Sequence, residues 1–587
     1  MTELMSGNAA IARGAYEAGV TVATGYPGTP STEILENLVK YKDAVYCEWG
    51  PNEKVALEVA AGACYTGARV LVTMKHVGLN VAADPLMTLA YVGTVGGLAI
   101  CVGDDPGMHS SQNEQDTRHF ARFAKCAILE PSDSQEAKDF IRYALEISEA
   151  FTTPVIVRTT TRVSHSRSLV EFGPYTPNET KIAFEKDPPR FVPIPVWGRL
   201  MRVKVEERLK KLAAFGCSHP LNRIEWRDRG LGIVTSSIAY QYVREVFPEA
   251  SVLKLGMAFP FPDELIRQFA AGVTKLLIVE ELDDFLEEHI KAMGIACDGK
   301  NVVPGIGELS PSRLRESRAK LEGKTYSMPV PVAQAADLPA RPPVLCAGCP
   351  HRGVFHALAQ LDVIVTGDIG CYSLGVFKPL SRIDTILCMG GGVTLAHGMD
   401  KAGEKRKVVG IVGDSTFFHS GITGLANIVY NQGCSTIIVV DNRTTAMTGH
   451  QDHPGTGKTL MGKATVAASI EEIGRACGVK RVVTVDPLDL AETLRVIKQE
   501  IAIAEPSLIV SRSPCVLAQK PEKVHRRVVN DETCKKCGLC LKLGCPAMEG
   551  GKGLTPAINP ASCIGCSMCE QVCKFGAIGT EVVEEAI

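Results

Sequence analysis

The sequence lacks an excess of charge of either sign. Its 63 Lys and Arg residues nearly balance 65 Asp and Glu residues, leaving a formal net charge of −2 at pH 7. Proteins that bind nucleic acid or an anionic membrane surface usually carry a basic excess, so the composition favours neither partner. The hydrophobic fraction of 45% and the charged fraction of 22% are those of an ordinary globular protein. The length of 587 residues suggests three to five domains.

Long uncharged runs are also scarce. The N-terminal segment mixes charged with apolar residues, so we expect no secretory signal there. Residues 85–103 carry no charge, but their glycines and proline favour a helix followed by a buried strand over a membrane span. We therefore expect a cytoplasmic protein. In that reducing compartment, clustered cysteines bind metals or act in catalysis more often than they form disulfides.

Cysteine is abundant, with 21 residues, and two runs near the C-terminus have ferredoxin-like spacing. The bacterial ferredoxin run is C-x2-C-x2-C-x3-C-P, and its fourth cysteine ligates the other cluster. The run CIGCSMCEQVC has this spacing with Lys574 in place of proline, whereas CKKCGLCLKLGCP keeps Pro546 but has one extra residue in its last gap. The crossing rule predicts two [4Fe–4S] clusters, one held by Cys534, Cys537, Cys540 and Cys573 and the other by Cys545, Cys563, Cys566 and Cys569. The alternative, a pair of zinc knuckles, rarely uses the third close cysteine of such runs.

Alternating helix-like and strand-like patterns organise the rest of the chain, and they predict an α/β fold with parallel sheets. Apolar runs predict buried strands at 70–73, 98–102, 276–280, 408–412 and 436–440, and small residues predict a helix at 55–66. Residues 181–230 are charged and look irregular, which is typical of an insertion or linker, and the proline-rich segment 328–343 indicates an interdomain linker. No short tandem repeat is present. The predicted domains are three α/β domains at 1–180, 231–330 and 344–520, and a small ferredoxin-like domain at 526–587.

Two predicted strand ends in the third α/β domain carry oxygen ligands. Asp414 follows one strand and Asn442 follows the next, so a carboxylate and a carboxamide should lie side by side at one edge of a parallel sheet. Such ligands suit Mg²⁺, with the backbone carbonyl of Thr444 as a third and the rest supplied by a diphosphate and water. The glycines at 390–392 precede a helix-like run, where a backbone without side chains could approach phosphate oxygens. A helix-capping aspartate and a turn asparagine are the plain alternative.

These residues resemble a known motif. The pair is similar to the thiamine-diphosphate motif GDG…NN, with Ser415 in place of the last glycine and Asp441 in place of the first asparagine. The stretch AMTGHQ at 446–451 resembles MTGGQ, and YPGTPS at 26–31 resembles YPxTPS, both of the 2-oxoacid:ferredoxin oxidoreductases. The resemblance to this thiamine-dependent family covers nearly the whole chain. It includes the domain order of pyrimidine, intermediate and diphosphate domains and a two-cluster tail, and details such as CAGCPHRG fit its aryl-pyruvate branch.

The resemblance implies a catalytic glutamate in the pyrimidine domain. In thiamine enzymes such a glutamate hydrogen-bonds to the aminopyrimidine ring and promotes deprotonation of the thiazolium carbon. Glu53 precedes Gly62 by nine residues, which is the family spacing, and Gly67 and Gly78 match later glycines. Glu48 is the second candidate. Either residue could instead be a solvated acid in the first turn of a helix.

The resemblance implies two further sites. Thr29 lies in a turn that faces the 2-oxoacid in the family, although capping of a helix that begins at Pro30 would also explain it. Four more cysteines match the order and spacing of a third cluster that lies close to thiamine in relatives, and they are Cys346, Cys349, Cys371 and Cys515. Because CAGCPH departs from the commoner CPGCGH, four buried thiols that never meet remain the alternative.

The family's activity implies oxidative decarboxylation of aryl pyruvates such as indolepyruvate. Coenzyme A would take the acyl group to give an aryl-acetyl-CoA, and electrons would pass one at a time to ferredoxin. The chain lacks the GxGGQG stretch of the family's γ-type domain, so we expect a β subunit that carries it, in an α2β2 assembly with thiamine between pyrimidine and diphosphate domains.

Three other functions stay open at this point. The first is an oxidoreductase of the same family that acts on another 2-oxoacid, which a comparison of substrates would reveal. A non-oxidative thiamine-dependent decarboxylase or carboligase would share Glu53, Asp414 and Asn442 but has no use for the cysteine-rich tail. An electron-transfer module with a decayed thiamine pocket would have no reason to retain those three residues. Dependence of turnover on a one-electron acceptor, and binding of thiamine diphosphate, separate these cases.

Overall fold

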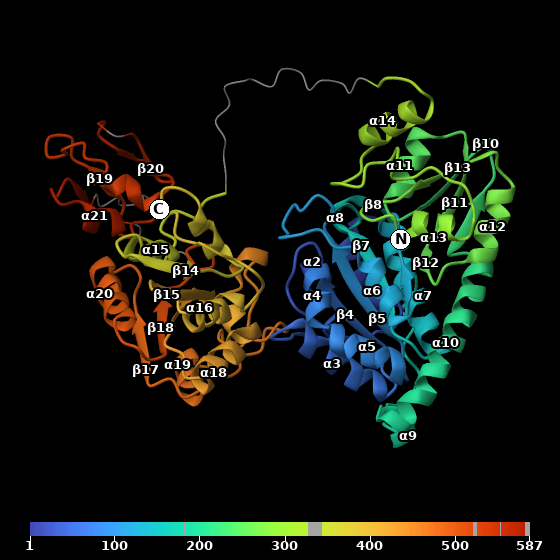
Figure 1. Ribbon diagram of the computed structural model, residues 1–587, viewed down its shortest axis with the longest axis horizontal. Coiled ribbons are helices and arrows are strands. Elements are labelled where there is room, and N and C mark those ends of the chain that lie inside the picture. Colours follow the sequence, from blue (N-terminus) through green and yellow to red (C-terminus); the bar gives the residue numbers. More distant parts are fainter. Residues whose placement is uncertain (181, 327–342, 520–524, 552, 581–587) are drawn as a thin grey trace. The chain divides into compact units, whose positions relative to one another are not determined.

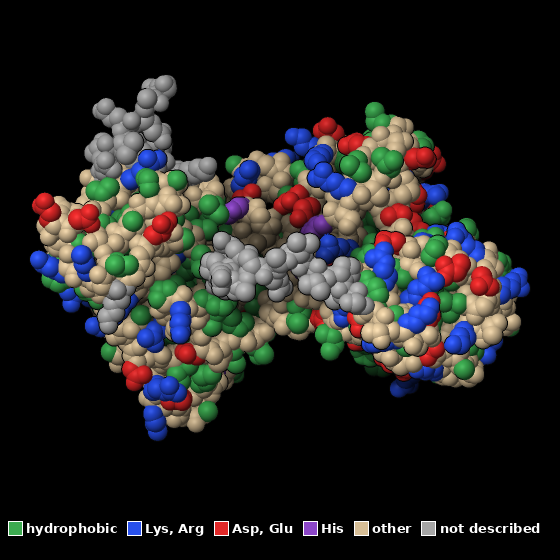
Figure 2. Space-filling view, turned by 90° about the horizontal axis from the view of Figure 1, so that it is seen from above, with side chains coloured by type: hydrophobic (Ala, Val, Ile, Leu, Met, Phe, Trp, Pro, Cys, Tyr) green, Lys and Arg blue, Asp and Glu red, His purple; other side chains and the backbone are tan. Residues whose placement is uncertain are grey.

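The computed structural model describes residues 1–180, 182–326, 343–519, 525–551 and 553–580 (Figure 1). The chain forms two compact units, Met1–Ala336 and Asp337–Ile587, and each is described by itself. Apart from its last residue, the predicted linker at 328–343 lies outside the described residues. On the face of each unit shown in Figure 2, Lys and Arg side chains are interspersed with Asp and Glu, as the balanced composition predicts. No helix among the described residues is both long and apolar enough to cross a bilayer.

The first sheet of unit 1 has seven strands in the order β12-β6-β7-β5-β4-β2-β3. All neighbouring strands are parallel except β12, which runs antiparallel to β6. This arrangement confirms the predicted α/β class. Because β12 lies in the predicted intermediate domain, the first two predicted domains share one sheet. The strands are β2 (Val22–Gly25), β3 (Tyr46–Trp49), β4 (Val70–Lys75), β5 (Leu98–Asp104), β6 (Ala127–Leu129), β7 (Val155–Thr160) and β12 (Met257–Phe259).

Helices pack around this sheet, and apolar small residues let them approach it closely. The predicted helix at 55–66 is α3, which begins at Glu53 and ends at Tyr65. The uncharged stretch 85–103 is helix α5 followed by strand β5, as predicted. A two-stranded antiparallel ribbon, β1 (Thr2–Ser6) with β8 (Arg167–Glu171), lies beside the sheet. The helices are α1 (Gly7–Glu17), α2 (Thr32–Leu38), α3 (Glu53–Tyr65), α4 (His76–Val81), α5 (Ala83–Val92), α6 (Thr117–Ala124), α7 (Ser134–Phe151) and α8 (Thr161–His165).

The expectation that 181–230 is irregular was wrong. Much of this segment is α10 (Pro195–Ser218), a 24-residue helix preceded by α9 (Pro188–Phe191). One face of α10 is buried through Met201, Val205 and Leu212, whereas Val196 and Leu200 are exposed. Exposed apolar residues and many charges obscured the helical period in the sequence, because apolar residues are not confined to one face.

The second sheet of unit 1 has the order β13-β10-β11-β9, with β9 antiparallel and the rest parallel. Buried ion pairs join it to the first sheet, since Arg118 bridges Asp116 and Glu280 at 2.5 Å each. The elements are β9 (Asn222–Glu225), β10 (Asp228–Ser236), β11 (Ala250–Leu255), β13 (Lys275–Val279), α11 (Ala239–Val246), α12 (Asp263–Ala271), α13 (Phe285–Ala292) and α14 (Pro311–Leu321).

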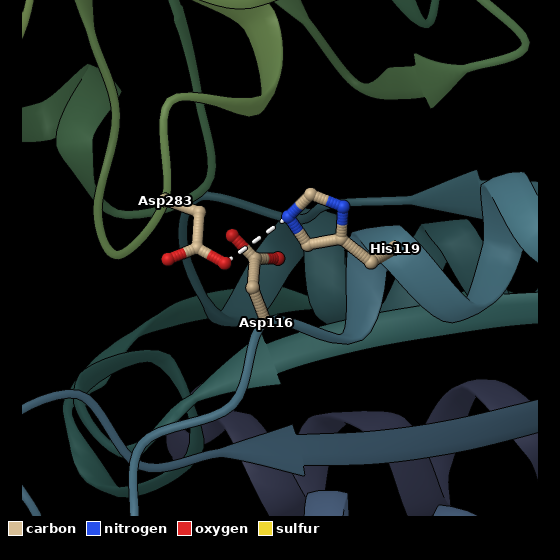
Figure 3. A group of neighbouring side chains, drawn as sticks. All are labelled: Asp116, His119 and Asp283. Carbon is tan, nitrogen blue, oxygen red and sulfur yellow. Dashed lines mark hydrogen bonds and ion pairs between the residues drawn. The ribbon is translucent and has the colours of Figure 1, made fainter.

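Three side chains near this joint, Asp116, His119 and Asp283, lie close enough together to suggest a metal site (Figure 3). The Nε2 atom of His119 is 3.1 Å from the Asp283 carboxylate, and both side chains are exposed. The Asp116 carboxylate, however, already accepts from both Nε and Nη2 of Arg118. Its charge is thus compensated, and the group is an ion-pair cluster between the two sheets.

Unit 2 contains a parallel five-stranded sheet in the order β14-β15-β16-β18-β17. The C-terminal region adds two short antiparallel ribbons, β19 with β22 and β20 with β21, as in a small two-cluster ferredoxin-like domain. The main elements are β14 (Val363–Thr366), β15 (Lys407–Gly413), β16 (Thr436–Asp441), β17 (Arg481–Val485), β18 (Ser507–Arg512), β19 (Arg527–Val529), β20 (Met548–Glu549), β21 (Ala557–Ile558), β22 (Ile578–Thr580), α15 (His351–Leu358), α16 (Gly391–Lys401), α18 (Ile422–Tyr430), α19 (Ile470–Ala476), α20 (Leu490–Ile501) and α21 (Met568–Val572).

Candidate active site

The C-terminal ends of β15 and β16 bring Asp414 and Asn442 to one edge of the sheet in unit 2. The two strands are parallel neighbours, and Gly413 pairs with Val440 in their register. Asp414 is 3% exposed and Asn442 is 7% exposed. The Oδ1 atom of Asn442 accepts from the backbone N–H of Thr444 at 3.3 Å. Asp414 and Asn442 therefore lie at neighbouring strand ends, as the sequence predicts. Their binding of a magnesium ion stays a prediction.

A second carboxylate, that of Asp441, is buried beside Asp414. Burial, followed by the negative charge of Asp414, raises the pKa of Asp441. Burial also opposes ionisation of Asp414, but the hydrogen bond and charge of His453 outweigh it and lower the pKa of Asp414. The imidazole Nε2 lies 3.1 Å from Asp414 Oδ2. Sequence reasoning missed His453, because no spacing rule ties it to Asp414.

The donor set at this edge fits a hard divalent cation. Arg512 donates to Asp441 at 2.7 Å, whereas the described residues give Asp414 no Lys or Arg partner. A buried carboxylate without a strong cation is unfavourable, and a carboxylate, a carboxamide and a backbone carbonyl are oxygen ligands that Mg²⁺ accepts. The carbonyl of Thr444 already accepts from the N–H of Ala446 at 3.0 Å, which leaves its second lone pair for a metal.

The amides of Gly390 and Gly392, at the start of α16, already have a hydrogen-bond partner within the chain. The N–H of Gly392 donates to Asp368 Oδ2 at 3.0 Å, and the amide of Gly390 also bonds to that carboxylate. Asp368 is fully buried, and burial raises its pKa to about 7. A phosphate would have to use other donors here, because Asp368 occupies these two. This bond, which joins the segment after β14 to the start of α16, could not be predicted from a local sequence pattern.

In unit 1, Glu53 is the first residue of α3 and is 5% exposed. The side chain of Asn52 caps the helix by accepting from the N–H of Val55. The Glu53 carboxylate packs against Gly78, where an added Cβ would lie 2.4 Å from Oε1. The competing candidate, Glu48, is less buried, and its carboxylate accepts from the hydroxyl of Tyr46 in an exposed hydrogen bond. A buried carboxylate suits proton transfer to a bound ring better than a solvated one.

Thr29 does not cap a helix, so the structure disfavours capping as the alternative explanation of this motif. Helix α2 begins at Thr32, with Ser31 as its N-cap, and the Thr29–Pro30 peptide bond is cis. The turn is closed by the hydroxyl of Ser31, which donates to the carbonyl of Gly28, and by the N–H of Gly28, which donates to Thr32. Thr29 itself is partly exposed. Its contact with the substrate stays a prediction.

The four cysteines predicted to hold a third cluster come together in unit 2. Burial raises the pKa of Cys371 to about 11, and the neighbouring thiols of Cys515 and Cys346 add to this shift. Burial also raises the pKa of Cys349, and the neighbouring thiols of Cys346 and Cys371 add to that shift. The backbone N–H of Cys515 donates to the carbonyl of Asn442 at 2.9 Å. The alternative in which these thiols never meet is therefore disfavoured, and the cysteine group adjoins the Asp414–Asn442 edge.

The cysteines of the C-terminal region line two separate cavities. One cavity of about 430 Å³ is bordered by Cys545, Cys563, Cys566 and Cys569. The other, of about 350 Å³, is bordered by Cys534, Cys537, Cys540 and Cys573. Each set contains three cysteines from one run and the fourth from the other run, which is the crossed arrangement that the ferredoxin motif predicts.

A buried arginine joins this C-terminal region to the five-stranded sheet. Arg352 on α15 is 1% exposed and donates to the carbonyls of Leu543 at 2.6 Å and Leu345 at 2.7 Å. Nearby, Gly348 has no room for a side chain, because Ile564 occupies the space where a Cβ would lie. Gly348 stands between Cys346 and Cys349, and Ile564 follows Cys563, so the two cysteine loops are in direct contact.

Comparison with known families matches three parts of the chain. Residues 13–198 match the family "Pyruvate flavodoxin/ferredoxin oxidoreductase, thiamine diP-bdg". Residues 368–511 match "Thiamine pyrophosphate enzyme, C-terminal TPP binding domain", and residues 556–579 match "4Fe-4S binding domain". These matches confirm thiamine diphosphate and iron–sulfur clusters as cofactors and disfavour zinc in the tail. The magnesium ion and the individual ligands stay predictions.

Curated relatives and one solved structure extend the comparison. The chain is 41% identical to an indolepyruvate oxidoreductase subunit IorA of Methanothermobacter marburgensis, over 98% of this chain and 97% of that protein. It is also 41% identical to the subunit IorA of Pyrococcus horikoshii, over 98% and 96%. A 2-oxoglutarate:ferredoxin oxidoreductase from Magnetococcus marinus aligns with a TM-score of 0.46 and 16% identity, over 55% of this chain and 65% of that one, which is too distant to bear on the site.

Each of these two alignments with a subunit IorA covers 98% of this chain at 41% identity. The chain belongs to the family of indolepyruvate oxidoreductase subunit IorA, within the thiamine-dependent 2-oxoacid:ferredoxin oxidoreductases.

Proposed function

We propose that this chain is the thiamine-binding and electron-collecting subunit of an enzyme that oxidatively decarboxylates aryl pyruvates. Indolepyruvate is the proposed substrate, coenzyme A the acyl acceptor and ferredoxin the electron acceptor. The observation that carries the proposal is the hydrogen bond from Cys515 to Asn442, because it sets a four-cysteine group against the proposed metal edge. A non-oxidative thiamine enzyme has no need for that proximity. The printed names of the relatives support the choice of indolepyruvate.

In this proposal the edge of the sheet in unit 2 holds the diphosphate through a magnesium ion. Asp414, Asn442 and the carbonyl of Thr444 are the proposed ligands, and His453 keeps the Asp414 carboxylate ionised and oriented. Thiamine diphosphate, when bound, supplies a carbon nucleophile and accepts the electron pair left by the departing CO₂. The protein's part is to hold the cofactor in place and to exclude water from this buried edge.

The proposed role of Glu53 is to exchange a proton with the pyrimidine ring. Its carboxylate is buried at the start of α3 and fixed on one side by Gly78. A carboxylate in such a pocket is poorly solvated, so a hydrogen bond to a ring nitrogen is worth more there than in water. Thr29, in the turn before α2, is the proposed hydroxyl contact to the 2-oxoacid.

The three cysteine sets provide a direction for the electrons. The set that includes Cys515 adjoins Asn442, and its loop touches the loop of Cys563 through the contact of Gly348 with Ile564. The Cys563 set and the Cys573 set are linked along the chain, because each takes three cysteines from one run and its fourth from the other run. We infer that single electrons leave the thiamine edge in this order and exit from the tail to ferredoxin.

The proposed assembly contains a second kind of subunit. The curated relatives are themselves described as subunits, and this sequence has no γ-type GxGGQG stretch. We propose a β subunit that supplies this domain, in an α2β2 enzyme. Size-exclusion chromatography with light scattering of the co-expressed subunits tests the assembly, and an active enzyme made of this chain alone would contradict it.

Anaerobic reduction of ferredoxin by the reconstituted αβ protein tests the function. Indolepyruvate, phenylpyruvate, pyruvate and 2-oxoglutarate are compared with coenzyme A present, and indolepyruvate should give the highest kcat/KM. Omission of coenzyme A should stop multiple turnover. Pyruvate as the best substrate would overturn the aryl-pyruvate assignment. Release of CO₂ at an undiminished rate without a one-electron acceptor would show a non-oxidative enzyme instead.

A further inference from the structure

A cavity open to solvent lies in unit 1, between helices α9 and α10 and the C-terminal ends of α5 and α7, and its empty space together with the adjoining open solvent is about 1090 Å³. None of the proposed thiamine, substrate or cluster residues borders it. Its walls include the aromatic side chains of Tyr91 and Phe151. Four basic side chains and two acidic ones line it, and they are Arg190, Lys204, Arg208, Lys211, Asp187 and Glu207. The cavity therefore carries an excess of positive charge that the balanced composition of the whole chain does not predict.

Three of the basic residues lie on one face of α10. Lys204, Arg208 and Lys211 are spaced four and three residues apart, so their side chains are neighbours on the helix. Like charges at this spacing destabilise a helix by about 0.2–0.5 kcal/mol per pair. Within the described residues, the ammonium groups of Lys204 and Lys211 form no ion pair, although ion pairs occur elsewhere on the same helix, as between Arg202 and Glu206.

Arg208 is the buried member of this group. It is 8% exposed, and its Nη1 and Nη2 atoms donate to the carbonyls of Thr152 and Ala90. The Nε–H group is buried and has no hydrogen-bond partner. Burial lowers the pKa of Arg208, and no carboxylate of the described residues forms an ion pair with it. Each Nη group carries two N–H donors, and the bonds to the two carbonyls use one of each, so Arg208 keeps further donors for a ligand in the cavity.

Capping of helices explains part of this arrangement. The carbonyl of Ala90 belongs to the last turn of α5, and Thr152 follows the end of α7, so the guanidinium neutralises the negative ends of two helix dipoles. Capping does not account for the buried Nε–H group of Arg208, which has no hydrogen-bond partner among the described residues. It also leaves the lysines one turn before and one turn after Arg208 unexplained, because they reach neither of those carbonyls.

We propose that this cavity is a binding site for a phosphate-bearing small molecule, with Lys204, Arg208 and Lys211 as its phosphate ligands. Guanidinium and ammonium donors that converge from several positions match the several oxygens of a phosphate group. The volume is larger than one phosphate needs, and the rings of Tyr91 and Phe151 offer an apolar wall for a base or similar group. A nucleotide is therefore the favoured form of the ligand over inorganic phosphate.

Isothermal titration calorimetry of the αβ holoenzyme with ADP and with inorganic phosphate tests this site. ADP should bind, and more tightly than inorganic phosphate. In the double variant Lys204→Gln, Lys211→Gln, the Kd for ADP should rise at least tenfold, because two of the phosphate ligands are lost. The turnover with the 2-oxoacid should not change, since neither lysine belongs to the proposed thiamine or cluster sites.

Lys210→Gln is the matched control, because Lys210 is exposed on the same helix but does not border the cavity. It removes the same charge and should leave the Kd nearly unchanged. Equal weakening by Lys210→Gln would show that only the general field of the helix matters and would overturn the proposal. So would the absence of binding by both probes at millimolar concentration, or ADP binding that the double variant does not alter.

Discussion

Replacement of Gly78 by alanine is the sharpest test of the proposed role of Glu53. An ideal Cβ at Gly78 would lie 2.4 Å from Glu53 Oε1, 2.7 Å from Cγ and 2.8 Å from Cδ. Ordinary contacts begin near 3.4 Å, so the carboxylate must move by about 1 Å to make room. A displacement of that size at a reacting group costs on the order of 10²-fold in rate. We therefore expect Gly78→Ala to lower kcat about 10²-fold.

The assay is anaerobic ferredoxin reduction with indolepyruvate, together with iron content and far-ultraviolet circular dichroism to show that the fold and clusters remain. Gly62→Ala is the control, because Gly62 lies within the same helix as Glu53 and has no atom within 4 Å of an added Cβ. It should keep full activity and stabilise the helix by about 0.5–1 kcal/mol. Near-normal kcat in Gly78→Ala would refute the reasoning, and an equal loss in Gly62→Ala would show that the assay reports helix damage.

Three other predictions follow from the same structure. Glu53→Gln should lower turnover by at least about 10²-fold while the cluster absorbance stays unchanged, whereas Glu48→Gln should remain active; the reverse pattern would move the catalytic role to Glu48. Cys371→Ala should lower the iron content from about 12 to about 8 atoms per chain and stop ferredoxin reduction, and an unchanged iron content would exclude Cys371 as a cluster ligand. Arg352→Met should leave buried carbonyls without donors and cost roughly 3 kcal/mol or more in the free energy of unfolding of unit 2, measured by urea denaturation followed at the clusters; a cost below about 1 kcal/mol would show that Arg352 does not join the tail to the sheet.

The sequence predicted those parts of the structure in which a local pattern decides the outcome. Uncharged β-branched runs such as 70–73 and 436–440 became buried parallel strands, because only a sheet covered on both faces can bury them. Cysteine spacing predicted the crossed sets of the tail for a similar reason, since four thiolates must converge on one cube.

Features that depend on contacts distant in sequence could not be predicted in this way. The bond of His453 to Asp414 and the bond of Asp368 to Gly392 each join residues more than twenty positions apart, and no periodicity marks them. The helix α10 was missed because its buried face is specified by packing against the pyrimidine domain, while its other faces mix charged and apolar residues. Capping by Thr29 stayed open in the sequence because Thr and Pro favour a helix start, whereas in the structure Ser31 and Thr32 provide the closing hydrogen bonds of the turn.

The contact between Gly348 and Ile564 has a consequence for how the protein matures. Each residue sits within a CxxC loop. If both loops bind iron as proposed, the metal would help to hold each loop in its final shape. Because the side chain of Ile564 packs against Gly348, a loop that lost its metal and its shape would also remove a packing contact from the other loop. Iron loading of the two loops should therefore be cooperative, and oxygen damage that strips one of them should soon spread to the other.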